Sequence, residues 1–399
     1  MWGVTQRYLD TLAKPHTQLA YLDILHGGQP VATVQGGYTD PGSGDSLFLI
    51  DGQVRVDKTT VRREGTFTLL NPGGKLIPQD VEDLLAEYVT EIRAWVGVRY
   101  WDAPLPVPYT SQTGGQLIAG VPPTEVEYVP VGTLVVTDVD TSNFPQITCQ
   151  CYDRAWLLAN FPAPYSVAAA ADPSDAISDV LSLFVPAARL QVNFPIGADL
   201  SVPATTFDAD SSGADACFNI AGAVGWQFYA DPMGTFTVAA QPTTDDQPVL
   251  SLTPAPGASL MRPTRHTGES VGQMYNAVVF TSEGGSTAPL RGYAQDDDPS
   301  SRTYVGRVGI RPYFASQPGL TTAEQCNQMA LTWLRSILGI ATELGVPIMP
   351  NHALESGDVI HVTDDQQGIN ESVIVDSFTV ALRASAGPQL LTCRPRVTS

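Results

Sequence analysis

The run Asp296-Asp297-Asp298 is the densest cluster of metal-ligand side chains in the sequence. Three carboxylates could bind Ca²⁺, a hard cation that prefers oxygen ligands. Adjacent residues do not share one face, however, and the spaced ligand loop with its distal Glu is missing. We interpret the run as a solvated loop, with an ion site at Asp296–Asp298 as the alternative. The pairs Asp245-Asp246 and Asp364-Asp365 have the same interpretation.

Cys149 and Cys151 would place two sulfurs on one face of an extended strand. A structural zinc needs four ligands, and the sequence has neither a second Cys-x-Cys pair nor two closely spaced histidines. The cysteines are odd in number and scattered, which indicates free, buried thiols and no disulfide framework. The histidines are equally dispersed, outside any metalloprotease or nucleophile-elbow motif: His16, His26, His266, His352 and His361.

Four aromatic residues, Trp95, Tyr100, Trp226 and Tyr229, could form a platform for a sugar, although aromatics at alternating strand positions more often belong to a core. Glycosidase chemistry needs two converging carboxylates, which a sequence with 41 acidic residues neither supports nor excludes. No phosphate-binding loop or dinucleotide fingerprint is present. We therefore predict no catalytic, cofactor-binding or metal-binding residues, and no enzyme activity.

The balance of charge excludes several classes of partner. The 399 residues include 21 basic and 41 acidic side chains, so the net charge is 21 − 41 = −20. Such a chain lacks the basic surface that grips nucleic acid or an anionic membrane. Only Lys14, Lys58 and Lys75 are lysines, and we interpret the arginine bias as no more than a compositional hint of a GC-rich coding genome. Without a signal peptide or a long apolar run, we expect a soluble chain that is not exported by a standard route.

Periodicity predicts mostly strands in the first part of the chain. A hairpin is expected at 19–34, a half-buried strand at 92–100, and a strand pair at 126–137 and 146–152. One change of period, at Val81, Leu84, Leu85 and Tyr88, predicts a short helix.

The middle of the chain has an α+β pattern. Asp172-Pro173 is typical of a helix start, and 214–224 is a second helix candidate. Strands at 226–229 and 235–238 flank the turn Asp231–Gly234. Toward the end, Thr321-Thr322-Ala323-Glu324 resembles a capping box that opens a helix over 321–338. Short strands follow at 359–363, 373–378 and 390–394, so strand–helix–strand–strand units occur near both ends.

Several segments, taken in order, resemble the minor tail proteins of long-tailed actinobacteriophages, which are tail-tip hub proteins. The resemblance spans about residues 15–397. The segments are Val129–Val139, Cys151–Ala155, Pro164–Val167, Asp175–Ile177, Gly225–Asp231 with Gly234, Tyr275–Val279, Ala294–Pro299, Leu320–Thr322, Pro350–Val359 and Ile374–Phe378.

Such hubs are similar to the baseplate hub protein of contractile phages. The resemblance implies a β-rich α+β multidomain fold, with two tail-tube-like β-barrel domains flanking smaller α+β domains. On this basis we expect a barrel over 1–153, a middle α+β region over 154–262, and a second barrel over 263–399 that contains helix 321–338. The helix should pack against a sheet. A long C-terminal extension, found in larger hub relatives, is not expected.

The resemblance further implies a structural virion protein at the tail tip, assembled in the host cytoplasm. Three copies would form a ring around the DNA channel and join the hexameric tail tube to a three-fold tip. The implied partners are a distal tail or tube protein above, tip, fibre or spike proteins below, and the tape measure protein and non-specifically passing DNA in the lumen. The loops at 102–123 and 283–311 are candidate interface elements.

The charge then has a physical interpretation. A trimer carries 3 × (−20) = −60, and a negative lumen would repel passing DNA from its wall. The alternative is that the excess acid only keeps the protein soluble. Two alternative functions also remain open at this point, a wall-degrading hydrolase and a receptor-binding lectin-like module.

Overall fold

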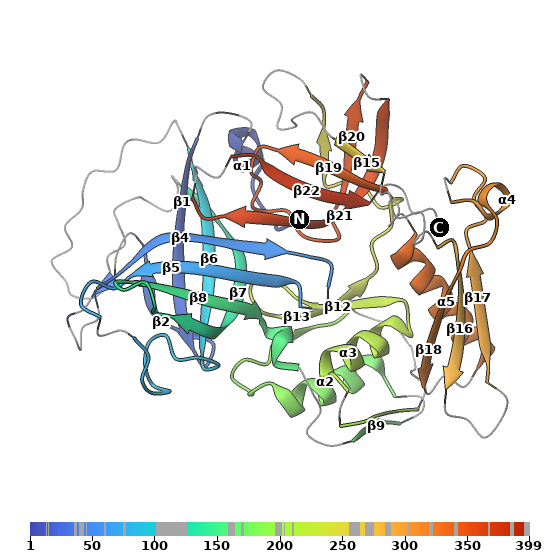
Figure 1. Ribbon diagram of the computed structural model, residues 1–399, viewed down its shortest axis with the longest axis horizontal. Helices are drawn as coiled ribbons and strands as arrows, with labels where there is room; N and C mark the ends of the chain where they lie inside the picture. Colours follow the sequence, from blue (N-terminus) through green and yellow to red (C-terminus); the bar gives the residue numbers. More distant parts are fainter. Residues whose placement is uncertain are drawn as a thin grey trace.

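The computed structural model divides into four groups of elements, and Figure 1 colours the chain from blue at the N-terminus to red at the C-terminus. The residues it does not describe are 13, 15, 36–37, 40–43, 45, 60, 75–76, 101–125, 159–163, 169–170, 196–201, 203, 210, 255–263, 268–274, 284–288, 302, 319–321, 339–341, 366–367, 384–386 and 395–399. The expected interface loop at 102–123 therefore lies outside the described residues.

The first group is an antiparallel array built from the N-terminal strands, preceded by the short helix α1 (Gln6–Leu12). Its path runs β4-β5-β8-β7-β6-β1-β2. Alternate residues of β5 and β8 are buried, as expected where one face of a strand covers a core. The strands are β1 (Thr17–His26), β2 (Gln29–Val34), β3 (Tyr38–Thr39), β4 (Ser46–Val56), β5 (Arg63–Leu70), β6 (Thr90–Arg99), β7 (Val126–Asp140) and β8 (Gln146–Asp153).

The second group is formed by C-terminal strands and one short strand from the middle of the sequence. The long strand β21 joins it to the first group, because Val359–Asp364 pair with its beginning and Val54–Val56 pair with its end. The strands are β14 (Leu250–Leu252), β15 (Thr264–Thr267), β19 (Thr342–Ile348), β20 (Val359–Asp364), β21 (Ile369–Ala381) and β22 (Gln389–Arg394).

Both groups thereby belong to one 14-stranded sheet with one shared apolar core. Leu22 and Phe67 from the first group and Val346 and Leu391 from the second belong to this core and are fully buried. Within the described residues no ladder closes either group into a ring. The β-rich α+β class is confirmed, and of the two expected barrels the described residues show no closed ring but one large sheet. The two strand groups are joined because β21 is long enough to pair in both.

The middle unit packs two helices against short strands and has a core of its own. The predicted cap of α2 is confirmed, since the Asp172 carboxylate accepts a bond from the Ser174 N–H and Pro173 begins the helix. Its elements are η1 (Arg154–Leu158), β9 (Tyr165–Val167), α2 (Pro173–Phe184), β10 (Val192–Asn193), β11 (Thr205–Phe207), α3 (Gly213–Gly222), β12 (Trp226–Ala230) and β13 (Phe236–Ala240).

The outer unit lies at the right-hand end of the molecule (Figure 1). It is a three-stranded mixed sheet that carries α5 on one face. The capping box begins one residue later than expected, because Thr322 pairs with Gln325. The elements are β16 (Ala277–Glu283), β17 (Arg291–Gln295), α4 (Val305–Val308), β18 (Pro312–Pro318) and α5 (Ala323–Ile337).

Two further expectations meet different outcomes. The prediction that α5 packs against a sheet is confirmed, although this sheet is separate from the large one. The helix predicted around Val81–Tyr88 is wrong, because the segment forms successive turns. The Asp83 carboxylate accepts bonds from the main-chain N–H groups of Gln79 and Asp80, which competes with helix formation. No helix in the described part of the chain is long and apolar enough to cross a membrane.

Candidate functional site

A buried group of arginines lies where the large sheet, the middle unit and the chain segment before β20 meet. We call it the arginine junction and define it by the buried Arg62, Arg63, Arg154 and Arg189 together with the half-buried Arg93. Arg63, at the start of β5, is fully buried. Its guanidinium donates to the carbonyl of Val131 at 3.1 Å, to the carbonyl of Ala230 at 2.6 Å, and to the carboxylate of Glu355. One side chain therefore connects β5, β7, β12 and the segment before β20.

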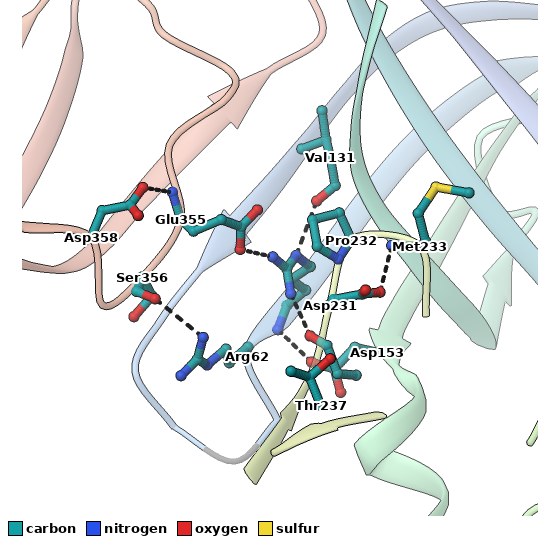
Figure 2. A network of polar contacts seen from close by, with 12 residues as sticks. Arg62, Val131, Asp153, Asp231, Pro232, Met233, Thr237, Glu355, Ser356 and Asp358 are labelled. Atoms are coloured by element: carbon teal, nitrogen blue, oxygen red, sulfur yellow. Dashed lines mark hydrogen bonds and ion pairs between the residues drawn. The ribbon is translucent and has the colours of Figure 1, made fainter. Parts of the chain in front are cut away.

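Arg62 extends the junction toward the same segment, as Figure 2 shows. Its guanidinium donates to the Ser356 carbonyl at 3.1 Å and to the Gln227 side chain at 2.8 Å. It also lies 3.6 Å from the centre of the Tyr229 ring, a cation–π arrangement. Burial lowers the pKa of Arg62 to about 10, so the group remains charged at neutral pH.

Asp153 ends β8 and holds the main chain at two places, the start of β5 and the η1 turn that follows β8. Its carboxylate accepts from the N–H of Arg63 at 2.9 Å and from the N–H of Ala155 at 3.0 Å. Figure 2 shows it on the side of the network opposite Glu355 and Ser356. Burial raises the pKa of Asp153 to about 6, while Arg63 opposes that shift.

Arg154 forms the most deeply buried ion pair of the junction. Its guanidinium makes two bonds to the Glu91 carboxylate, at 2.7 and 2.9 Å, and both side chains are almost wholly inaccessible. The remaining donors reach the carbonyls of Arg189 and Gly234, both at 2.8 Å. A bidentate pair with further bonds meets the conditions under which a buried charge is tolerated.

The turn between β12 and β13 is the part of the middle unit that enters the junction. Arg93 donates to the Met233 carbonyl at 3.2 Å, and Thr133 donates to the Pro232 carbonyl at 3.0 Å. Gly234 has φ +80°, and a Cβ there would lie 3.0 Å from the Arg154 guanidinium carbon. Glycine is thus required by both the backbone conformation and the close approach.

This arrangement holds the large sheet, the middle unit and the segment before β20 together. The guanidinium N–H groups donate to main-chain carbonyls and to paired carboxylates. Glu91 is completely buried. Buried carboxylates that are paired with arginine are poor candidates for general acid–base catalysis. Their oxygens already accept hydrogen bonds, and a substrate cannot reach them. The junction joins three parts of one chain into a single block.

The candidate residues for other chemistry are not brought together. Asp296 is buried and accepts bonds from the hydroxyls of Ser301 and Thr303, as part of a local turn. Cys149 and Cys151 are buried free thiols, and burial raises both thiol pKa values, that of Cys149 to about 12. The described residues contain no group of three or more His, Cys, Asp or Glu arranged to hold a metal.

The aromatic residues and acidic pairs are also dispersed. Trp95 stacks on Tyr21 with ring centres 5.7 Å apart, whereas Tyr229 lies under Arg62, so no shared sugar platform forms from them. The Asp246 carboxylate accepts the Thr243 N–H within a turn. Asp364 is buried at the end of β20. The segment 283–311, expected as a long interface loop, instead contains β17 and α4.

One face of the outer unit is exposed. Val278 and Phe280 of β16 pack against α5, so their neighbour Val279 points to the opposite side of the sheet. Val279 pairs with Tyr293 of β17 and with Phe314 of β18. Tyr293 is 45% exposed and Phe314 is 71% exposed. We call this cross-strand row of three residues the outer face.

Sequence reasoning missed the arginine junction, although a signal for it was present. Four of the segments that carry the family resemblance supply it: Val129–Val139, Cys151–Ala155, Gly225–Asp231 with Gly234, and Pro350–Val359. The arginine bias was the second signal, because arginine suits buried ion pairs better than lysine does.

Comparison with solved structures places this architecture among known folds. No protein-family model and no curated protein matches the sequence. A tail protein from Neisseria meningitidis MC58 matches with TM-score 0.59 and 13% identity, covering 94% of this chain and 96% of that one. The 43 kDa tail protein of prophage MuSo2 from Shewanella oneidensis matches with TM-score 0.57 and 10% identity, covering 94% and 98%.

The chain shares the fold of these phage tail proteins. A chain of the lidded PdpA–VgrG complex from Francisella is also similar, with TM-score 0.51 and 7% identity, covering 95% of this chain and 53% of that chain. Each match extends over nearly the whole chain, so it includes both strand groups of the large sheet together with the middle and outer units.

Proposed function

We propose that this protein is a structural component of a phage tail, acting as a hub or adaptor at the tail tip. The end-to-end match to two phage tail proteins is the observation that carries this proposal. The arginine junction supports it, because it joins the large sheet and the middle unit of one chain by buried hydrogen bonds, as a structural subunit requires. Origin from a long-tailed actinobacteriophage stays a prediction.

The finer proposal is a homotrimeric ring around the DNA channel. In this ring each chain supplies two tube-like β modules, one from each strand group of the large sheet, so that three chains imitate six-fold symmetry. Their near-equivalence and the domain limits 1–153, 154–262 and 263–399 stay predictions. The ring would contact a tail tube or distal tail protein above and tip, fibre or spike proteins below, with the tape measure protein and DNA in its lumen.

The outer face is our candidate for a subunit contact. Phe314 exposes 71% of its surface and lies beside Tyr293 and Val279 in one row. Exposed aromatic side chains that adjoin on a flat sheet are typical of interaction surfaces. With a net charge of −20 per copy, we further propose that acidic side chains line the lumen and keep DNA from adhering.

Native mass spectrometry of the purified chain, followed by symmetry analysis of particle images, tests this function. We expect a mass of three chains and a ring with a central passage. A globular monomer at all concentrations, also in the presence of a tail tube protein, would contradict the hub assignment. Zymography on purified cell wall provides an independent control, in which we expect no clearing.

A further inference from the structure

A small cavity lies beside the end of β21 and the start of β22, away from the arginine junction. Its volume is about 40 Å³. A water molecule needs roughly 10–15 Å³ measured in this way, so the cavity has room for more than one water or for a small polyatomic group. The lining residues are Gln18, Pro350, His352, Thr379, Val380, Ala381, Arg383, Gly387, Pro388 and Gln389.

Gln389 brings an unused hydrogen-bond donor to this cavity. The side chain is 5% exposed, and its amide oxygen accepts the Asn351 N–H at 2.8 Å. That bond fixes the orientation of the amide, so the other terminal atom is the NH₂ group. This nitrogen has no partner among the described residues. Because Gln389 lines the cavity and Asn351 does not, we infer that the NH₂ group is the end of the amide that faces the cavity.

His352 brings a second polar group, which is a donor at Nε2 in the tautomer whose Nδ1 accepts from Tyr8. The ring is 3% exposed, and its Nδ1 lies 3.1 Å from the hydroxyl of Tyr8, which is also outside the lining. Burial raises the pKa of Tyr8, so its hydroxyl keeps its proton and can donate it to Nδ1. A neutral imidazole that accepts at Nδ1 carries its own proton at Nε2. Nε2 has no partner among the described residues.

The charge of the cavity lining is positive, so it attracts the same kind of ligand as these two donors. Arg383 is the charged residue of the lining, and no Asp or Glu among the described residues belongs to it. Arg383 forms an ion pair with Asp51 at 3.9 Å, a separation longer than a hydrogen bond. Two N–H donors and a guanidinium in one lining suit an acceptor with negative charge, and a planar carboxylate offers two acceptor oxygens.

We propose that this cavity binds a carboxylate group, held by the side-chain N–H groups of Gln389 and His352 and by the guanidinium of Arg383. The carboxylate comes either from a free small acid or from an acidic side chain of a second copy of the chain. The site is independent of the proposed role in the tail.

The test uses the full chain labelled with ¹⁵N-histidine at neutral pH, and acetate as the probe. The His352 resonances are assigned from their loss in the His352→Gln variant. We expect Nε2 to be protonated, and its signal to shift saturably as acetate rises through the millimolar range. A chloride titration at equal ionic strength should give no comparable shift. A shift that depends on protein concentration without acetate identifies a second copy as the source.

The matched variant is Gln389→Glu, which keeps an oxygen for the Asn351 N–H but replaces the donor with a carboxylate. We expect it to fold and to weaken acetate binding by at least about tenfold, through loss of a donor and like-charge repulsion. Three results would overturn the proposal: an Nδ1-protonated ring, no saturable acetate response, or equal responses to acetate and chloride. An unchanged response in the variant would overturn it as well.

Discussion

The middle unit is joined to the large sheet by buried charged hydrogen bonds, whereas α5 is joined to the outer sheet by apolar side chains. In the junction, Arg154 and Glu91 are buried together and satisfy each other. In the outer unit, Met329 and Leu334 of α5 pack on Val278 of β16. The first contact demands particular partners at particular angles, while the second demands mainly shape and volume.

The difference concerns what each region does for the molecule. Charged bonds to main-chain carbonyls fix the angle between units, because a small rotation would leave a buried charge unpaired. In the outer unit the helix is held on its sheet by apolar packing, without such charged bonds among the described residues. Its outer face remains exposed. We infer that the junction makes each subunit rigid and that the outer unit is the part available for assembly.

Removing Arg154 should produce the largest effect. Arg154→Ala leaves Glu91 buried without its bidentate partner, with Arg189 at 3.8 Å as the ion pair that remains within the described residues, and should lower the free energy of unfolding by about 3–5 kcal/mol. Chemical denaturation measures the change. Arg55→Ala is the control, because Arg55 is 61% exposed in its pair with Asp57 and should cost less than about 1 kcal/mol. Equal losses in the two variants would remove the distinction between junction and surface.

The outer unit should be most sensitive to volume. A Cβ at position 292 would lie 2.0 Å from the main-chain carbon of Cys326 in α5, so Gly292→Ala must push the helix off the sheet. We expect a loss of about 1–3 kcal/mol, typical of overpacking. Gly3→Ala serves as the control, since nothing lies within 4 Å of the added atom. Crystallography of the variant should show α5 displaced while the junction is unchanged; an unmoved helix contradicts the expectation.

Titration of His352 provides an effect of comparable size that depends on pH, outside both regions. Burial, with a contribution from His16, lowers the pKa of His352 from 6.5 to about 3. The unfolded chain therefore binds a proton that the folded chain refuses between these values, and this residue's contribution to stability rises with pH across that window. The slope is at most about 1.4 kcal/mol per pH unit.

The measurement is the difference in free energy of unfolding between the wild type and His352→Gln, taken from pH 4 to pH 8. This difference should rise toward pH 6.5 and then stay constant. Taking a difference cancels groups such as Asp153, whose raised pKa acts with the opposite sign between pH 3.8 and about 6. A flat difference would show that His352 is accessible to protons in the fold.

The smallest effect on the subunit itself is expected at the outer face. Phe314→Asp changes a side chain that is 71% exposed, so the free energy of unfolding should change by less than about 0.5 kcal/mol. Native mass spectrometry should nevertheless show loss of the oligomer, because the charge is placed in a contact surface. Val31→Asp, at a site 48% exposed on β2, is the matched control and should leave the oligomer intact. Retention of the oligomer in Phe314→Asp removes the outer face from the assembly.

Most individual elements could be predicted from the sequence, because their causes are local. The Asp172 cap and Pro173 predict α2, and alternation predicts β6 and β8. The failure at Val81–Tyr88 has a local cause too, because side-chain bonds from Asp83 favour turns there although the apolar spacing matches a helix. The capping box at Thr322 was displaced by one residue because Gln and Glu can both close it.

Most strands and helices follow from local sequence, since periodicity, caps and turns depend on neighbouring residues. The contact of Arg63 with Glu355, 292 positions away, and the pairing of β21 with β4 follow from the folded chain alone. The same holds for the nitrogens of Gln389 and His352 that have no partner among the described residues. The physical reason is that a buried charge or amide can be satisfied by many residues of the right type, and the folded backbone alone determines which one lies within hydrogen-bond distance.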